Sequence, residues 1–314
     1  MKLLDLFSGI GGFHLGLEQS GFKFDWVGFS EIDKFASQQY KRRFPNATEL
    51  GDITSVRARE LPNDITILCG GFPCQAFSIA GKREGFNDTR GTLFFEIARI
   101  LRHFRDIEKP IPYFILENVK GLLNHEDGRT FATIYGVLTD LDYTIECQLL
   151  NTWWFLPQNR ERIYIVGRFR GESRPKIFPI GKADKIFDIR QSTEQVAATL
   201  QSPGNACGNY KGMNMIQTGL NQIGTIGEDS EATRIYDTTC ARTIKNGGGM
   251  GAKTGLYNID SSIRRLTPTE CERLQGFPDG WTEGQSDTQR YKQLGNAVSV
   301  PVVKAIGENL IEVL

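Results

Sequence analysis

Short apolar runs alternate with amphipathic stretches over the first half of the chain, from Met1 to about Gly167. The runs are about four to eight residues long, which is typical of strands buried on both faces of a sheet. The stretches between them have helical spacing. Strands that alternate with helices predict an α/β fold with a doubly wound, mostly parallel, Rossmann-like sheet. The predicted strands are KLLDLF, WVGFSE, ITILCGGF, YFILEN and RIYIVG, and the predicted helices are FHLGLEQSG, KFASQQYKRRF and TLFFEIARILRHF.

The composition of the chain changes from about Lys182 to Tyr291, where Gly, Thr, Asn and Gln dominate and helical periodicity fades. We interpret residues 182–292 as a second, smaller and irregular domain of short strands and loops. The first domain then comprises 1–181 and 293–314. Helical spacing returns in the last stretch, with Pro301 in the first turn, and we expect this helix to pack on the first domain.

Composition and charge argue against several classes of protein. No apolar run approaches the ~18 residues of a membrane helix. The chain meets Asp5 and glycines too early for a signal peptide, so we expect a cytoplasmic protein without membrane contact. The 37 basic and 37 acidic residues cancel, so a polyanion would have to bind at local patches. The cysteines form no CxxC pair, which argues against a disulfide scaffold and a metal site.

A glycine-rich turn follows the first predicted strand, at residues 8–12, and a helix follows the turn. Glycines at a strand's carboxyl end let a ligand approach the backbone at the helix N-terminus. Glu31 follows the second predicted strand and could accept both hydroxyls of a ribose, and Asp52 could accept an adenine amine. The spacing is GxGGxxxG instead of GxGxxG, and nothing obviously cradles a pyrophosphate, so we favour S-adenosylmethionine over a dinucleotide. Taken singly, the glycines can simply shape a tight turn and each acid can be a solvated surface group.

Two cysteines lie close together in ITILCGGFPCQAFS. Cys69 lies within the predicted strand and is expected to be a buried small hydrophobe. Cys74 lies just beyond the carboxyl end of the strand, where sheets of this kind build their sites. A nucleophilic thiolate needs a base or a cationic environment. The three histidines lie in no protease-like cysteine signature, so a Cys–His hydrolase is disfavoured. An inert structural thiol is the alternative for Cys74.

Polar residues follow the next two predicted strands. Glu117 ends YFILEN, where a carboxyl group could donate or share a proton. Gln158, Arg160 and Arg162 precede or begin RIYIVG. Alternate residues of an extended chain face one side, so these three side chains are expected to converge, with Arg162 binding a polar oxygen of the substrate. The alternative is a charge ladder at the edge of a strand.

These segments occur in a fixed order along the chain: DLFSGIGGFHLGL, SEID, GDIT, GGFPCQAFSIAGKREGFNDTRGTLFFEIARIL, ENVKGLL, QNRERIYIVG, RRLTPTECERLQGFPDGW and YKQLGNAVSVPV. Together they resemble the ordered motifs of the DNA cytosine-5 methyltransferases of bacterial restriction-modification systems. The resemblance covers the chain except for roughly 172–230. PCQ, ENV and QxRxR are catalytic signatures of the family.

The resemblance implies a catalytic role for each signature. Cys74 would add to C6 of cytosine, because C5 is a poor nucleophile until this covalent adduct forms. Glu117 would contact N3 and the exocyclic amine, and Arg162 would hold O2. Arg160 would support the Cys74 loop, and Gln158 completes the signature. The group that removes the C5 proton is left unassigned, with a bound water as one candidate.

The resemblance also implies the cofactor S-adenosyl-L-methionine, with S-adenosyl-L-homocysteine as the product. Ala297 stands where the family usually has Ser, which removes one hydrogen bond to the cofactor. The implied cofactor residues are Phe7, Ser8, Gly9, Gly11, Gly12, Glu31, Ile32, Asp52, Ile53, Gly71, Pro73, Leu93, Asn296 and Ala297.

Double-stranded DNA is the implied partner, because a base inside a duplex must be flipped out to expose C5 and C6. The loop AGKREGFNDTRGT would close over it, and 182–292 would be the target-recognition domain with a hinge. Segment 233–257 resembles that of the prototype that methylates GCGC, so a CG-containing target such as GCGC is our expectation. Glu231 stands where the family's intruding Gln is expected. The implied DNA-binding residues are Lys82, Arg83, Arg90, Glu231, Arg234, Thr243 and Ile244.

Three alternatives remain open. The tRNA-methylating branch of the family shares the catalytic motifs, but the variable domain of about 100 residues favours the DNA enzymes. A catalytically silent DNA-binding member is disfavoured by Cys74, Glu117 and Arg162. A nicotinamide dehydrogenase lacks its fingerprint and a matching catalytic acid. We expect a monomer, paired in function with a restriction endonuclease.

Overall fold

The computed structural model describes residues 1–73, 93–170, 176–181, 186–187, 221–226, 230, 233–245, 254–259 and 262–314. Five residues that the sequence analysis singled out lie outside this described part: Cys74, Lys82, Arg83, Arg90 and Glu231.

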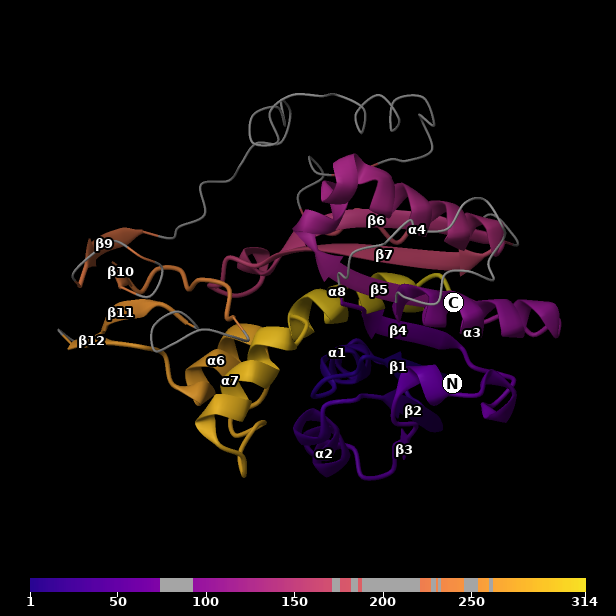
Figure 1. The fold of residues 1–314 in the computed structure, drawn as a ribbon, viewed down its shortest axis with the longest axis horizontal. Coiled ribbons are helices and arrows are strands. Elements are labelled where there is room, and N and C mark those ends of the chain that lie inside the picture. The colour runs from indigo at the N-terminus through magenta and orange to yellow at the C-terminus, as the bar shows by residue number, and fades with distance from the viewer. Residues whose placement is uncertain are drawn as a thin grey trace.

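Eight strands of the described chain form one sheet, in the order β3-β2-β1-β4-β5-β7-β6-β8 (Figure 1). All pairings from β3 through β5 are parallel, whereas β7 runs antiparallel to both of its neighbours and β8 antiparallel to β6. The predicted doubly wound, mostly parallel sheet is therefore confirmed. The strands are β1 (Lys2–Leu6), β2 (Trp26–Ser30), β3 (Thr48–Glu49), β4 (Ile67–Gly71), β5 (Tyr113–Val119), β6 (Tyr143–Asn151), β7 (Glu161–Phe169) and β8 (Ile186–Phe187).

The antiparallel direction of β7 follows from its connection to β6. β6 ends at Asn151 and β7 begins at Glu161. A parallel crossover needs about a dozen residues or more, usually with a helix. The short link between these strands, with the single 3-10 turn Thr152–Trp154, therefore turns the chain back beside itself.

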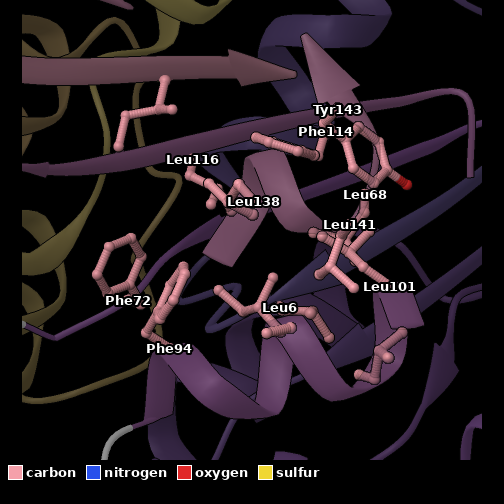
Figure 2. Close-up of a cluster of buried hydrophobic side chains, with 14 of the residues drawn as sticks. Leu6, Leu68, Phe72, Phe94, Leu101, Phe114, Leu116, Leu138, Leu141 and Tyr143 are labelled. Carbon is pink, nitrogen blue, oxygen red and sulfur yellow. The ribbon is translucent and has the colours of Figure 1, made fainter. Parts of the chain in front are cut away.

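Different helices cover the two faces of the sheet. Side chains alternate along β1, so that Leu4 and Leu6 face one layer and Leu3 faces the other. α3 (Leu93–Asp106) and α4 (Arg129–Asp140) pack on the first face, and Figure 2 shows part of this cluster. The other face is covered by α1 (Gly12–Gln19), α2 (Lys34–Arg43) and α8 (Val300–Ile311).

The C-terminal helix α8 packs against α1 on the larger sheet, where the sequence analysis expects it. A Cβ on Gly16 of α1 would lie 2.7 Å from Val303 of α8. The two helices therefore pack so closely here that only glycine fits at position 16. The remaining short helices are η1 (Ile53–Ser55), η2 (Ala58–Glu60), η4 (Lys120–Leu123) and η5 (His125–Gly128). Among the described helices, none is long and apolar enough to cross a membrane.

A second, smaller sheet of four described strands lies in the order β12-β11-β10-β9 and is followed by two helices (Figure 1). The expectation of short strands is confirmed here, whereas the two helices were not predicted. The buried cluster of these helices includes Ile10 of the turn after β1 and Ala36 of α2, so residues distant in sequence share one core. The elements are β9 (Gln222–Thr225), β10 (Arg234–Tyr236), β11 (Leu256–Ile259), β12 (Ser262–Arg264), α6 (Pro268–Gln275) and α7 (Asp287–Asn296).

Candidate active site

The glycine-rich turn between β1 and α1 has a left-handed backbone at three positions. Phe7, Gly9 and Gly11 have φ values of 53°, 54° and 85°. For a non-glycine residue such as Phe7, this conformation costs about 1–3 kcal/mol, which the surrounding structure must offset. The Ser8 N–H donates to Ser30 O at 3.1 Å, and the Gly11 N–H donates to Ser8 O at 2.9 Å. The turn is therefore bonded to the end of β2, the neighbouring strand.

Glu31, the predicted ribose acceptor, lies against this turn. Its two carboxylate oxygens accept the N–H groups of Gly9 and Asp33, each at 2.8 Å. Burial raises the pKa of Glu31, and the two backbone hydrogen bonds oppose that effect. Ile32 beside it is 78 % exposed, which leaves an apolar side chain available to a ligand.

Asp52 follows β3 and caps the short helix η1. Its carboxylate accepts the Thr54 N–H at 2.9 Å. The Ile53 side chain is buried in the core, so its backbone is the part placed to meet a ligand. A Cβ at Gly9 or at Gly51 would have no atom within 4 Å, so both glycines border open space. The parallel strands β3, β2 and β1 end side by side, which brings the predicted ribose and adenine acids to one edge of the sheet.

Glu117 and Arg162 form an ion pair across β5 and β7. Arg162 Nε lies 3.0 Å from Glu117 Oε1, and both side chains are largely buried. Arg162 also donates from Nη1 to Glu161 O at 2.8 Å. The antiparallel register pairs Val119 with Arg162 and Glu117 with Tyr164, so the two side chains leave adjacent strands close to one another. The carboxylate of Glu117, which accepts hydrogen bonds, therefore lies beside the positively charged guanidinium of Arg162.

The segment that leads to Cys74 lies beside this ion pair. Gly71 ends β4, and a Cβ there would lie 3.3 Å from Glu117 Oε2. Asn118 donates from Nδ2 to Phe72 O at 2.9 Å, which ties the outgoing chain to β5. Pro73 is exposed and is the last described residue before Cys74. Asn118 was not among the predicted site residues, although it directly follows Glu117 in ENV.

Arg160 and Gln158 have partners other than Arg162. Arg160 is 3 % exposed and donates to Ala297 O at 2.7 Å and to Gly295 O at 3.4 Å. Burial, followed by repulsion from Arg162, lowers the pKa of Arg160 to about 10. The Gln158 side chain donates to Arg242 O at 3.4 Å. The three side chains thus do not share one set of contacts, because β7 begins only at Glu161.

Gln158 and Asn159 pair with a segment that follows β10. Asn159 N–H donates to Ala241 O at 2.9 Å, and Ala241 N–H donates to Pro157 O at 2.8 Å. The Thr243 hydroxyl donates to Asn159 O at 2.6 Å. These bonds connect the residues just before β7 directly to the segment that contains Thr243, a predicted DNA-binding residue.

The other predicted site residues lie at element boundaries or in the core. Leu93 is the first residue of α3. Asn296 and Ala297 end α7. Arg234 begins β10, and the Ile244 side chain is buried in the core of the second sheet and its helices.

Sequence reasoning also missed Arg99 of α3, which donates from Nη2 to Ile53 O at 3.2 Å and to Val56 O at 2.9 Å. It thereby holds the turn that follows Asp52. Glu96, three residues earlier, pairs with Arg99 at 2.7 Å. That spacing signals only a helix-surface ion pair, so nothing in the sequence indicated the carbonyl contacts.

Comparison with known proteins decides the family. Residues 1–312 match the C-5 cytosine-specific DNA methylase family. The chain belongs to this family. It is an enzyme that methylates cytosine in DNA at C5, as the ordered motifs predict.

Two curated relatives of this methylase are aligned along nearly its whole length. Type II methyltransferase M1.ScrFI of Lactococcus lactis subsp. cremoris is 42% identical over 100% of this chain and 78% of its own. Type II methyltransferase M.HhaI of Haemophilus parahaemolyticus is 37% identical over 99% of this chain and 94% of its own.

A solved structure supports the fold of the methylase independently. The crystal structure of S. pombe Dnmt2 methyltransferase aligns with a TM-score of 0.68, covering 99% of this chain and 98% of that chain, at 20% identity. At this identity the likeness shows the fold alone. The fold of this chain is therefore one that a solved protein of low sequence identity shares over nearly its whole length.

Proposed function

We propose that this methylase transfers the methyl group of S-adenosyl-L-methionine to C5 of one cytosine in a specific duplex sequence, through a covalent bond between Cys74 and C6. The observation that carries the proposal is the buried Glu117–Arg162 pair, with Nε and Oε1 3.0 Å apart, beside the strand that leads to Cys74. An acceptor and a cation at one place match the polar edge of cytosine, which presents O2, N3 and an exocyclic amine.

The glycine turn and its acids have the chemistry needed to hold the cofactor. One carboxylate oxygen of Glu31 accepts the Gly9 N–H of the turn and the other accepts the Asp33 N–H, and each oxygen retains a lone pair for a ribose hydroxyl. Ile32 is exposed beside it, and Gly9 and Gly51 border open space. When bound, the cofactor supplies an electrophilic methyl group, with S-adenosyl-L-homocysteine as the product.

The chain's own residues would activate the cytosine. The Cys74 thiolate adds to C6, the C5=C6 π bond opens, and the electron pair becomes available at C5 while Glu117 shares a proton at N3. Arg162 holds O2 and so orients the ring. After C5 is methylated, a base removes the C5 proton, and the electron pair of that C–H bond restores the double bond and expels the Cys74 thiolate. A bound water is a candidate for this base.

The partner and setting of the enzyme are also part of the proposal. The relatives carry the name Type II methyltransferase, which supports double-stranded DNA as the substrate and a functionally paired restriction endonuclease. We propose a cytoplasmic monomer with a catalytic domain of residues 1–181 and 293–314 and a target-recognition domain of residues 182–292. Arg234 would contact a guanine edge, where arginine can bind O6 and N7 together, and a CG-containing target such as GCGC remains our expectation.

Transfer of a radiolabelled methyl group tests the proposal. The purified protein is incubated with labelled S-adenosylmethionine and mixed-sequence duplex DNA, beside a Cys74→Ala variant and a tRNA control. We expect label in 5-methylcytosine of DNA, lost in the variant, and sequencing of the product gives the target. Label in tRNA alone, or label in DNA that persists in the variant, would contradict the proposal.

A further inference from the structure

Trp281 joins the turn that follows α6 to the glycine-rich turn that follows β1. Its indole Nε1–H donates to Ile10 O at 3.0 Å, across a sequence separation of 271 residues. The Trp281 side chain is buried, with the residue 7 % exposed, and shares a core cluster with Ile10. The contact therefore lies in the interior and is shielded from competing water.

This contact fixes one peptide plane of the glycine turn. The Ile10 carbonyl accepts from Trp281, while the Gly11 N–H of the same peptide donates to Ser8 O at 2.9 Å. Because a peptide unit is planar, holding both its C=O and its N–H removes its freedom to rotate. The neighbouring Gly9 and Gly11 have φ values of 54° and 85°, and glycines of this kind would otherwise allow several turn conformations.

Trp281 is itself held from the side of α2. Its carbonyl accepts Arg43 Nε at 2.9 Å and also the Gln39 side-chain amide. The Arg43 guanidinium lies 5.0 Å from the indole ring centre. The rings of Phe44 and Phe277 lie 5.8 Å and 5.4 Å from it. A side chain held by this many neighbours can act as a fixed support for the residue that it contacts.

The same aromatic residues pack against the glycines of the turn. A Cβ on Gly11 would lie 2.6 Å from Phe44, and a Cβ on Gly12 would lie 3.3 Å from Phe277. One side of the turn is thus filled by rings that include the two neighbours of Trp281. Of Phe44, Phe277 and Trp281, only Trp281 carries a hydrogen-bond donor, and that donor binds the turn at Ile10 O.

We propose that Trp281 is a positioning residue for the cofactor, which acts by holding the Ile10 carbonyl and with it the glycine turn in the binding conformation. The inference rests on the proposed function, because it takes this turn as the place where S-adenosylmethionine binds. Within the part of the chain that the structure describes, Trp281 contacts neither Glu117 nor Arg162, so its removal alters cofactor binding and leaves the chemical step unchanged.

Trp281→Phe tests the proposal, since it keeps an aromatic ring and removes the donor. Loss of one buried hydrogen bond corresponds to about a three- to tenfold change in an equilibrium constant. We expect the dissociation constant for S-adenosylmethionine, measured by calorimetry, to rise by about this factor. KM for S-adenosylmethionine should rise in parallel, while kcat at saturating cofactor and KM for DNA stay at the wild-type values.

Thr282→Val is the matched control. The Thr282 hydroxyl binds the Glu272 carboxylate and accepts Arg290 Nε at 2.9 Å, so its removal loosens the same turn and leaves the indole contact in place. We expect this variant to lower the melting temperature without weakening cofactor binding. Equal weakening in both variants at equal loss of stability would assign Trp281 a general structural role and overturn the proposal.

The remaining outcomes separate this proposal from the proposed function. A wild-type protein that does not bind S-adenosylmethionine would overturn both. A wild-type protein that binds it and a Trp281→Phe variant that binds equally well would overturn only the role of Trp281. Should Trp281→Phe fail to fold, β-(3-benzothienyl)alanine at this position retains the bicyclic ring and lacks only the N–H. The same rise in the dissociation constant is then expected.

Discussion

The pKa of Asp5, in the strand that leads to the glycine-rich turn, offers a test of how burial affects charge in this part of the protein. It lies fully buried in β1, and its carboxyl group accepts the Tyr40 hydroxyl at 3.2 Å and the Cys69 thiol at 3.4 Å. Burial raises the pKa of Asp5 to about 8, with a smaller contribution from Glu31, although the two hydrogen bonds act in the opposite direction. We therefore expect Asp5 to be protonated in the folded protein at neutral pH.

The raised pKa of Asp5 has a defined consequence for stability. A group whose pKa is higher in the folded state contributes stability that is fully present below its unfolded pKa, near 4 for Asp. That contribution is lost as the pH rises through the folded pKa of about 8. Linkage then gives a decrease of about 3 kcal/mol in the free energy of unfolding between about pH 5.5 and about pH 8.

Asp5→Asn isolates this contribution, since the amide has the shape of a protonated carboxyl group and does not titrate. Chemical denaturation at both pH values should show the variant gaining about 3 kcal/mol relative to wild type on going to the higher pH. Asp64→Asn is the control: Lys2 lowers the pKa of this exposed residue, so its contribution is already complete at the lower pH. If the difference in unfolding free energy between Asp5→Asn and wild type is the same at both pH values, the pKa of Asp5 is not raised by burial.

Three further substitutions test other parts of the site. Gly12→Ala would place its Cβ 2.7 Å from Val298, so we expect a loss of about 1–3 kcal/mol in thermal or denaturant unfolding together with weaker cofactor binding in calorimetry. Arg160→Lys replaces a fork that reaches two carbonyls and should cost about 1.5–3 kcal/mol of stability, whereas the same change at the exposed Arg57 should cost almost nothing. Glu117→Gln should lower kcat by about 10²- to 10⁴-fold in single-turnover assays while calorimetry gives the wild-type affinity for S-adenosylmethionine.

The predictable part of the fold follows from local patterns. The apolar runs identified β1, β2, β4, β5 and β7 because most of the buried side chains in each of these strands are apolar. β6 was missed because Glu146 and Gln148 interrupt its apolar pattern. Both residues are buried, and their carboxylate and amide groups bind backbone groups of Ile177, Phe178 and Ile180, which no local pattern reveals.

The helix α6 could have been found from its N-terminus. Thr267 and Glu270 form a capping box, and Pro268 occupies the first turn, which together are a recognised start signal. The low periodicity of the surrounding sequence hid the helix. The amino-acid composition of residues 182–292 indicated an irregular region and did not indicate the short helices within it.

The candidate site could be predicted where its residues lie within or directly after a strand, because the local pattern fixes their positions. The glycine turn with Glu31 and the position of Glu117 at the end of β5 follow from the strand-turn-helix pattern. The bonds from Trp281 to Ile10 and from Arg160 to Ala297 span 271 and 137 residues. Such contacts depend on how separate segments pack, so only the structure could show them.

The proposed mechanism depends on the covalent bond between Cys74 and C6 of the target cytosine. A duplex that carries 5-fluorocytosine at the methylated position tests it most directly, because fluorine cannot leave C5 as a proton does and the adduct persists. We predict a protein–DNA complex that survives denaturation, forms only with S-adenosylmethionine, and maps to Cys74 by peptide mass spectrometry. An enzyme that methylates the ordinary duplex but gives no such adduct, or gives it at another residue, would contradict the claim.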